Sequence, residues 1–216
     1  QILPLGPTGY GDSPYQSVST FAGNPYFIDL EELIKKELLT KEECEACDWG
    51  GSESYVDYEK IYLSRYKLLR KAYEKADLKT DPDYAEFLKE EKDWLQDYCL
   101  FMAIKNDQKG ICWIDWPEEL KDRHSKAVKE AEKELAEEIE FYRFQQYCFT
   151  TQWRKLKAYA NKKGISIIGD VPIYVALDSS DAWANPEMLQ FDEDYDPKAV
   201  AGCPPDAFSA TGQLDV

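Results

Sequence analysis

The sequence predicts an α/β protein in which several helices accompany a buried strand of a parallel sheet. Residues 165–175 form an apolar, β-branched run without polar alternation, which is typical of a strand buried on both faces. Residues 57–163 instead carry apolar side chains at helical spacing. The chain has 216 residues, of which 44% are hydrophobic, so it can form a substantial core.

The N-terminus is expected to hold the end of a strand, residues 1–5, followed by a stiff loop over residues 6–16. Three glycines and two prolines in this loop exclude a helix. The loop also carries side chains that suit a polyhydroxylated ligand, because aromatic rings can stack on it and polar groups can bond to it. These candidate binding residues are Tyr10, Asp12, Ser13 and Tyr15. The alternative is a plain surface connection.

Capping signals predict where the next helices begin. Asp29 is expected to cap a short helix, Thr40 and Glu43 form a capping box, and Asp81 precedes a proline at a first helical position. Residues 57–76 are predicted to form one helix with a tyrosine stripe, which packs in the core or, alternatively, lines a sugar cleft. Residues 82–110 are predicted to form another helix.

The next helical pattern, residues 117–163, has an apolar stripe interrupted only by Gln146. A single helix of this length would span about 70 Å at ~1.5 Å per residue, which is long for a globular domain. We therefore expect a bend or break before Ile139, and an end at Gly164.

Two acidic positions near the C-terminal side are candidate site residues. Asp170 stands at the far end of the predicted strand, and in barrels of parallel strands that end faces the active site. We take Asp170 as a catalytic candidate; an acid that caps a loop is the alternative. Residues 202–214 form a second stiff loop, with paired prolines, that displays Asp206 and Phe208.

Composition excludes several classes of function. The net charge of -16 disfavours nucleic acid and anionic membranes as partners, and the sequence shows neither a transmembrane span nor a signal peptide. Cys44 and Cys47 have C-x-x-C spacing, but no second pair supports zinc, and no thioredoxin-like context supports redox chemistry. The thiols therefore indicate packing in a reducing, cytoplasmic location.

Nucleophile and cofactor motifs are also missing from the sequence. There is no G-x-S-x-G, P-loop, G-x-G-x-x-G or H-E-x-x-H pattern, and the one histidine, His124, lies in a charged helical stretch typical of a solvated surface. The candidate functional groups that remain are carboxylates and aromatic rings on rigid loops. Enzymes that break a glycosidic bond usually use a pair of carboxyl groups. We expect no metal and no cofactor.

Several long segments resemble signatures of the amylomaltase family, the 4-α-glucanotransferases or disproportionating enzymes. They are residues 3–29, 145–165, 167–187 and 201–214. The resemblance implies a partial (β/α)8 TIM barrel, containing its first strands, with large helical insertions. It divides the chain into a first barrel strand with a sugar-binding loop (1–30), a helical insertion subdomain (31–116), and a barrel helix, the strand ending at Asp170 and an acceptor-side loop (117–216).

The same resemblance implies roles for single residues. Tyr15 is similar to the family tyrosine that stacks on the donor sugar, and Asp170 to the aspartate that supports this sugar. Tyr10 resembles a tyrosine of a second glucan-binding groove. Asp206 and Phe208 resemble residues of the flexible loop on the acceptor side. The implied partner is an α-1,4-glucan or maltooligosaccharide, and the implied reaction is a retaining transfer without a cofactor.

One departure from the family limits this expectation. The family places its nucleophile in an Arg-x-Asp-His motif and its acid glutamate later still, and neither segment occurs in the 216 residues. We expect a fragment that is inactive alone, with the missing C-terminal half of the barrel as a partner. The alternatives are a non-catalytic glucan-binding or interaction module, and an acidic helical scaffold with no ligand.

Overall fold

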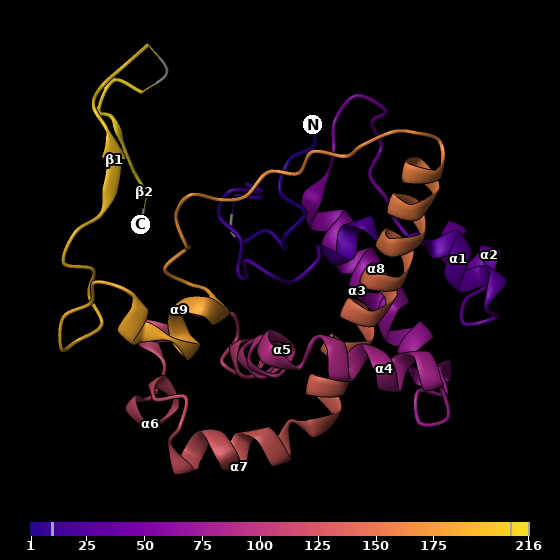
Figure 1. Cartoon of the computed structure of the whole chain (residues 1–216), viewed down its shortest axis with the longest axis horizontal. Helices are drawn as coiled ribbons and strands as arrows, with labels where there is room; N and C mark the ends of the chain where they lie inside the picture. Colours follow the sequence, from indigo (N-terminus) through magenta and orange to yellow (C-terminus); the bar gives the residue numbers. More distant parts are fainter. Residues whose placement is uncertain (10, 208, 216) are drawn as a thin grey trace.

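The structure is a computed structural model that describes residues 1–9, 11–207 and 209–215, and it is predominantly helical (Figure 1). Short 3-10 turns lie at Pro25–Phe27, Trp113–Asp115 and Pro186–Met188. The α-helices are α1 (Leu30–Lys35), α2 (Lys41–Glu45), α3 (Tyr58–Lys75), α4 (Pro82–Glu90), α5 (Lys92–Asp107), α6 (Glu118–Lys121), α7 (Lys126–Glu134), α8 (Ala136–Lys162) and α9 (Ser180–Ala184).

The core lies in two layers on either side of α8. On one side, α5 packs against α8 and α9, and this cluster is rich in aromatic rings, including Trp113 and Trp183, both fully buried. On the other side, α3 and the first turns of the chain pack against α8 through residues such as Leu33, Leu69 and Phe144. The long helix therefore serves as the central support of the molecule.

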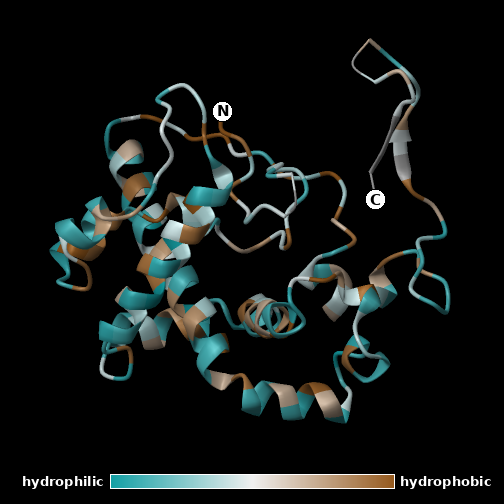
Figure 2. Ribbon diagram, turned by 180° about the vertical axis from the view of Figure 1, so that it is seen from behind, coloured by the Kyte–Doolittle hydropathy of each residue, from teal (hydrophilic) through white to brown (hydrophobic). Residues whose placement is uncertain are grey.

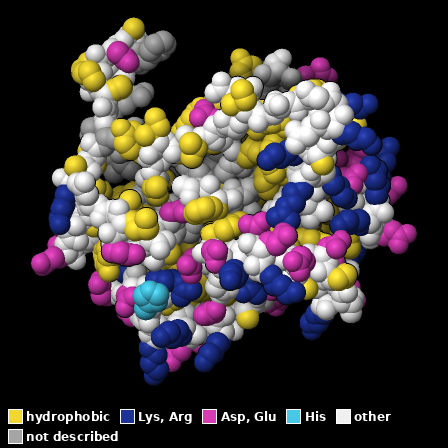
Figure 3. Space-filling model, in the orientation of Figure 1, with side chains coloured by type: hydrophobic (Ala, Val, Ile, Leu, Met, Phe, Trp, Pro, Cys, Tyr) yellow, Lys and Arg dark blue, Asp and Glu magenta, His cyan; other side chains and the backbone are white. Residues whose placement is uncertain are grey.

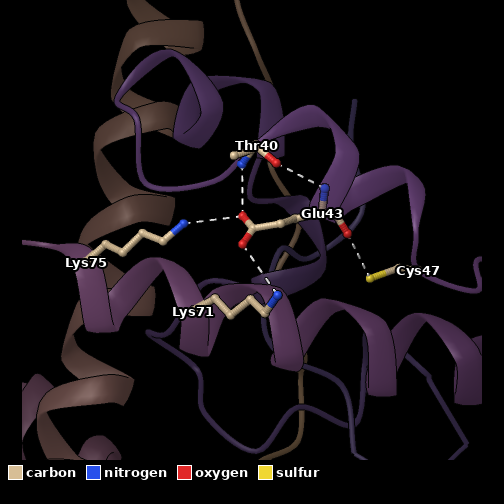
Figure 4. A network of polar contacts seen from close by, with 5 residues as sticks. All are labelled: Thr40, Glu43, Cys47, Lys71 and Lys75. Carbon is tan, nitrogen blue, oxygen red and sulfur yellow. Dashed lines mark hydrogen bonds and ion pairs between the residues drawn. The ribbon is translucent and has the colours of Figure 1, made fainter.

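The predicted helix starts are confirmed. The Asp29 carboxylate accepts a hydrogen bond from the Glu31 amide at 2.8 Å, and Asp57 and Asp81 cap α3 and α4 in the same way. Thr40 and Glu43 form the expected capping box, with bonds of 3.2 and 3.0 Å (Figure 4).

The capping box also connects α2 to α3. Each Glu43 carboxylate oxygen lies 3.4 Å from an ammonium group of α3, one from Lys71 and the other from Lys75, and the backbone carbonyl of Glu43 accepts a bond from the Cys47 thiol (Figure 4). The local cap thus holds the second helix of the chain on the longer third one. Among the described residues all six cysteines are free thiols, Cys44 and Cys47 included.

The predicted break before Ile139 is confirmed. The pattern is interrupted twice, at residues 122–125 between α6 and α7 and at Leu135 between α7 and α8. The predicted end is confirmed as well, because Gly164 has a φ of +75° and the Ile165 amide bonds to the Ala160 carbonyl, which closes the last turn. The expected single helix over 82–110 is wrong: it is broken at Glu91. This break lets α4 and α5 pack separately, with Phe87 of α4 5.6 Å from the Tyr147 ring of α8.

The predicted buried strand over residues 165–175, here called the apolar segment, is wrong in this structure. The segment is extended but largely exposed, with 65% of Ile168 and 89% of Ile173 accessible to solvent. Figures 1 and 2 show it crossing from the end of α8, past the N-terminus, to α9. Its one backbone bond to residues 1–5 joins the Ile2 amide to the Ile168 carbonyl at 2.9 Å. A buried strand needs covering layers, which the described residues do not provide.

The sheet present in the described residues is a small antiparallel hairpin. Strands β1 (Ala201–Cys203) and β2 (Gln213–Asp215) pair with Ala201 opposite Asp215. Figure 1 shows this hairpin projecting from the helical body beyond α9. Residues 1–5, expected as the end of a strand, do not form one here. The partial barrel and the division at residues 30 and 116 stay predictions.

The molecular surface mixes both signs of charge. In Figure 3 basic and acidic side chains alternate over the lower face, around α7, whereas hydrophobic side chains gather in the upper part and on the hairpin. No helix within the described ranges has both the length and the apolar character needed to cross a membrane.

Candidate functional site

Tyr15 and Asp170, which lie far apart in the sequence, meet in the structure. The Tyr15 hydroxyl donates a hydrogen bond to Asp170 Oδ2 at 2.9 Å, and the amide of Val171 donates to the other carboxylate oxygen at 2.9 Å. Tyr15 keeps 45% of its surface exposed, so its ring is available to a ligand. The hydrogen bond to Asp170 also raises the pKa of the Tyr15 phenol.

The loop that carries Tyr15 is closed at its neck by bonds between its two ends. Thr8 and Ser17 form an isolated antiparallel bridge, and the Val18 amide donates to the Pro7 carbonyl at 3.2 Å. The Ser17 hydroxyl donates to the same carbonyl at 2.8 Å. A side chain on Gly6 would collide with that hydroxyl, so the neck requires glycine there.

The predicted residues Asp12 and Ser13 shape the tip of this loop. Asp12 has a φ of +54°, and its carboxylate accepts a bond from the Thr8 hydroxyl at 3.2 Å. The Ser13 hydroxyl accepts a bond from the Tyr15 amide at 3.3 Å. Both side chains thus help to orient the tyrosine, while remaining partly accessible. Tyr10 lies outside the described residues.

Two glutamines of α8 hold the chain that follows the loop. Gln146 accepts from the Gly23 amide at 2.7 Å and donates to the Gly23 carbonyl at 2.9 Å. Gln152 makes the same pair of bonds to Asp29, at 2.7 and 3.1 Å. The sequence contained a signal for Gln146, as the one polar interruption of an apolar stripe. Nothing in the sequence pattern indicated Gln152.

Asp206 lies on the separate β1–β2 hairpin. Its carboxylate accepts a bond from the Ser209 amide at 2.8 Å, and its own amide donates to the Ser209 carbonyl at 3.0 Å. Figure 1 places this hairpin apart from the N-terminal loops. The structure therefore brings Tyr15 and Asp170 together but does not bring Asp206 to them, and Phe208 lies outside the described residues.

Two cavities lie beside residues 1–5, and the smaller of them also reaches Asp170 and the apolar segment. A cavity of about 220 Å³ is lined by Ile2, Leu3, Leu5, Trp153, Lys157, Ile167, Gly169 and Asp170. A larger one, of about 970 Å³, is lined by residues 1–5 together with Phe27, Asp29, Glu32, Phe149, Gln152, Trp153, Lys155 and Leu156. Asp170 is the acidic group on the wall of the smaller cavity.

This arrangement can bind hydroxylated ligands. A fixed carboxylate accepts hydrogen bonds from hydroxyl groups, and an exposed phenol ring offers both a stacking face and a polar edge. Within the described parts of the chain, no three His, Cys, Asp or Glu side chains gather as metal ligands would. The groups that the site offers to a ligand are the Asp170 carboxylate and the Tyr15 ring.

Comparison with known proteins shows extensive similarity. Residues 1–214 match the family described as 4-alpha-glucanotransferase. A 4-alpha-glucanotransferase from Clostridium butyricum is 50% identical over 215 residues, which are 99% of this chain and 44% of that protein. One from Thermus thermophilus is 48% identical over 217 residues, 99% of this chain and 42% of that protein.

A solved structure is similar as well. The amylomaltase from Streptococcus agalactiae, solved in complex with acarbose, superposes with a TM-score of 0.91 at 39% identity, covering 98% of this chain and 43% of that one. The chain thus spans less than half the length of the curated relatives it matches.

Proposed function

Because the chain belongs to the 4-alpha-glucanotransferase family, we propose that it is part of an enzyme that transfers α-1,4-glucan segments between maltooligosaccharides. The transfer is of the retaining kind. One carboxylate attacks the sugar and forms a glycosyl-enzyme bond while a second carboxyl protonates the departing glucan. An acceptor hydroxyl then displaces the enzyme carboxylate and gives its proton to the second group. This chain contributes glucan-binding surface. The carboxyls that break the bond belong to the remaining length of the relatives.

The hydrogen bond between Tyr15 and Asp170 is the observation that supports this proposal most directly. It fixes an exposed ring and a carboxylate side by side, although they are 155 residues apart in the sequence. In the proposed complex the ring stacks on a glucose unit, and Asp170 accepts bonds from the hydroxyls of the same unit. That the Streptococcus agalactiae relative was solved with acarbose supports an oligosaccharide as the ligand.

The other loop residues have supporting roles in the proposal. Asp12 and Ser13 hold the tip that presents Tyr15, and Tyr10 belongs to a second glucan contact on the same loop. Asp206, on the β1–β2 hairpin, and Phe208 act on the acceptor side. This assignment requires the hairpin to approach the sugar while it is bound.

We further propose that the rest of a (β/α)8 barrel covers the apolar segment and the larger cavity. Residues 1–5 and the apolar segment lie side by side, joined at Ile2 and Ile168, and both lead toward the point where Tyr15 meets Asp170. Two neighbouring parallel strands would have this arrangement. The exposed apolar side chains, such as Ile173 at 89%, are those that further strands and helices would bury.

A chimera tests the proposal. Residues 1–214 replace the matching segment of the Clostridium butyricum relative, and the product is incubated with maltotriose. We expect glucose and longer oligomers, and at least a tenfold loss of kcat/KM in Tyr15→Ala and Asp170→Asn chimeras, because each removes a sugar contact worth ~1.4 kcal/mol or more. Tyr159→Ala, which removes an exposed α8 tyrosine, is the control. The proposal would be refuted by a folded chimera that transfers no glucan. It would also be refuted if kcat/KM were unchanged in both the Tyr15→Ala and the Asp170→Asn chimeras.

A further inference from the structure

The loop with Tyr15 is anchored at its base as well as at its tip. Thr20 follows the neck of the loop, and both of its donors bond to one carboxylate: its amide to Asp181 Oδ2 and its hydroxyl to Asp181 Oδ1, each at 2.9 Å. Both oxygens of Asp181 are therefore engaged with a single residue. Bonds to an ionised carboxylate are stronger than those between neutral groups.

Asp181 is held in place because its helix, α9, is fixed in the core. Trp183 of α9 is fully buried, and its indole N–H donates to the Leu120 carbonyl at 3.0 Å. Its ring lies 5.9 Å from that of Phe101 and 6.0 Å from that of Trp116. A carboxylate on such a helix provides a rigid anchor.

The residue before Asp181 contacts the same part of the loop. The amide and the hydroxyl of Ser180 both donate to the Val18 carbonyl, at 2.9 and 3.2 Å. Val18 in turn closes the neck of the loop through Pro7. One connection, residues 165–184, thus holds the loop twice: Asp170 bonds to Tyr15, and Ser180 and Asp181 bond to the base.

We propose that Asp181 is a positioning residue for the glucan site, whose carboxylate holds Thr20 so that the Tyr15 hydroxyl stays on Asp170. The proposal takes its ligand from the function proposed above, whereas its structural part depends only on the bonds just described. Without the bonds between Thr20 and Asp181, the backbone bonds that close the loop remain, but the loop moves relative to α9. The Tyr15 hydroxyl is then bonded to Asp170 for only part of the time.

Three variants and one control test this inference in the full chain. Asp181→Ala removes both bonds to Thr20, Thr20→Val removes only the hydroxyl bond, and Thr20→Ser keeps both. The control is Asp77→Ala, which removes a matched carboxylate–threonine bond of 2.8 Å, to Thr80, outside the site. The readouts are amide hydrogen exchange of residues 11–19, the ¹³Cζ NMR signal of Tyr15 assigned with Tyr15→Phe, and acarbose binding by calorimetry.

We expect Asp181→Ala to speed exchange in the loop about tenfold, because the lost bonds lower the cost of local opening, and to shift the Tyr15 signal. Thr20→Val changes both in the same direction by less, and Thr20→Ser restores wild-type values. A merely structural role would lower global stability without moving the Tyr15 signal of the folded chain. If Asp181→Ala does not fold, Thr20→Val decides.

Exchange within twofold of wild type and an unmoved Tyr15 signal in Asp181→Ala and Thr20→Val would overturn the inference. Acarbose binding, measured by calorimetry, distinguishes a failure of this inference from a failure of the proposed function. Weaker acarbose binding by Asp181→Ala, by about tenfold, supports both. Failure of the wild-type chain to bind acarbose and of the chimera to transfer glucan would refute the proposed function, while the exchange and NMR results would still decide the role of Asp181.

Discussion

Replacing Gln146 by leucine should destabilise the chain far more than the same replacement at Gln152. Both glutamines lie on α8, and each makes one accepted and one donated bond to the backbone of a single residue. They differ in environment: Gln146 is 1% exposed and its partner Gly23 is buried, whereas the partner of Gln152, Asp29, is exposed. Comparing the two variants therefore separates the free energy of a hydrogen bond itself from the cost of leaving a buried backbone group without a partner.

The magnitudes follow from that difference. In Gln146→Leu, the amide and carbonyl of Gly23 lose their partners inside the protein, at ~1–3 kcal/mol each. Burial of the leucine side chain returns ~1 kcal/mol. The net loss in the free energy of unfolding is therefore ~1–5 kcal/mol. In Gln152→Leu, water replaces the amide, and the loss is ~1 kcal/mol or less.

Urea unfolding followed by tryptophan fluorescence measures both losses, with the midpoint and the slope fitted separately. Circular dichroism of the folded variants is the control for an unchanged helix content. Equal losses in the two variants, or a loss below ~1 kcal/mol for Gln146→Leu, would show that burial of Gly23 does not decide the outcome.

Three further outcomes are expected. Thr40→Ala should cost ~1 kcal/mol of unfolding free energy, because it removes half of the capping box, and an unchanged urea midpoint would contradict this. Burial raises the pKa of the Tyr26 phenol from 10.0 to about 12. The contribution of this residue to the free energy of unfolding is therefore complete below pH 10 and is lost as the pH rises toward 12. Tyr26→Phe should make the alkaline loss of stability less steep, and an identical dependence on pH in the variant and the wild type would contradict this. The side-chain nitrogen and oxygen of the fully buried Gln145 have no hydrogen-bond partner among the described residues. Gln145→Met should therefore stabilise the chain by ~1–2 kcal/mol in the same urea assay. A loss of stability would contradict that reasoning.

Local signals in the sequence predicted what local chemistry decides. Asp29, Thr40 and Asp81 cap helices because an oxygen next to free amides bonds to them in any fold. The break at Leu135 followed from length alone, because a single helix would have exceeded the size of the domain. Glu91 was missed because the apolar period continues on both sides of the one residue that interrupts the helix.

Long-range contacts decided the rest. The composition of the apolar segment indicates that it prefers burial, but whether anything covers it depends on other parts of a protein, so the predicted strand was wrong here. The meeting of Tyr15 with Asp170 followed from resemblance to a family rather than from spacing. The bonds between Thr20 and Asp181 have no periodicity or motif that could reveal them, because each residue is ordinary within its own stretch.

The uncovered apolar segment also affects how the chain behaves in concentrated solution. An extended, β-branched stretch with open backbone groups is a template to which a second molecule can add a strand. The net charge of -16 opposes that encounter through mutual repulsion. Salt shortens the range of the repulsion, to ~10 Å at 0.1 M, without weakening the apolar attraction. Colloidal stability of the isolated chain therefore falls as ionic strength rises, and storage at low salt preserves it.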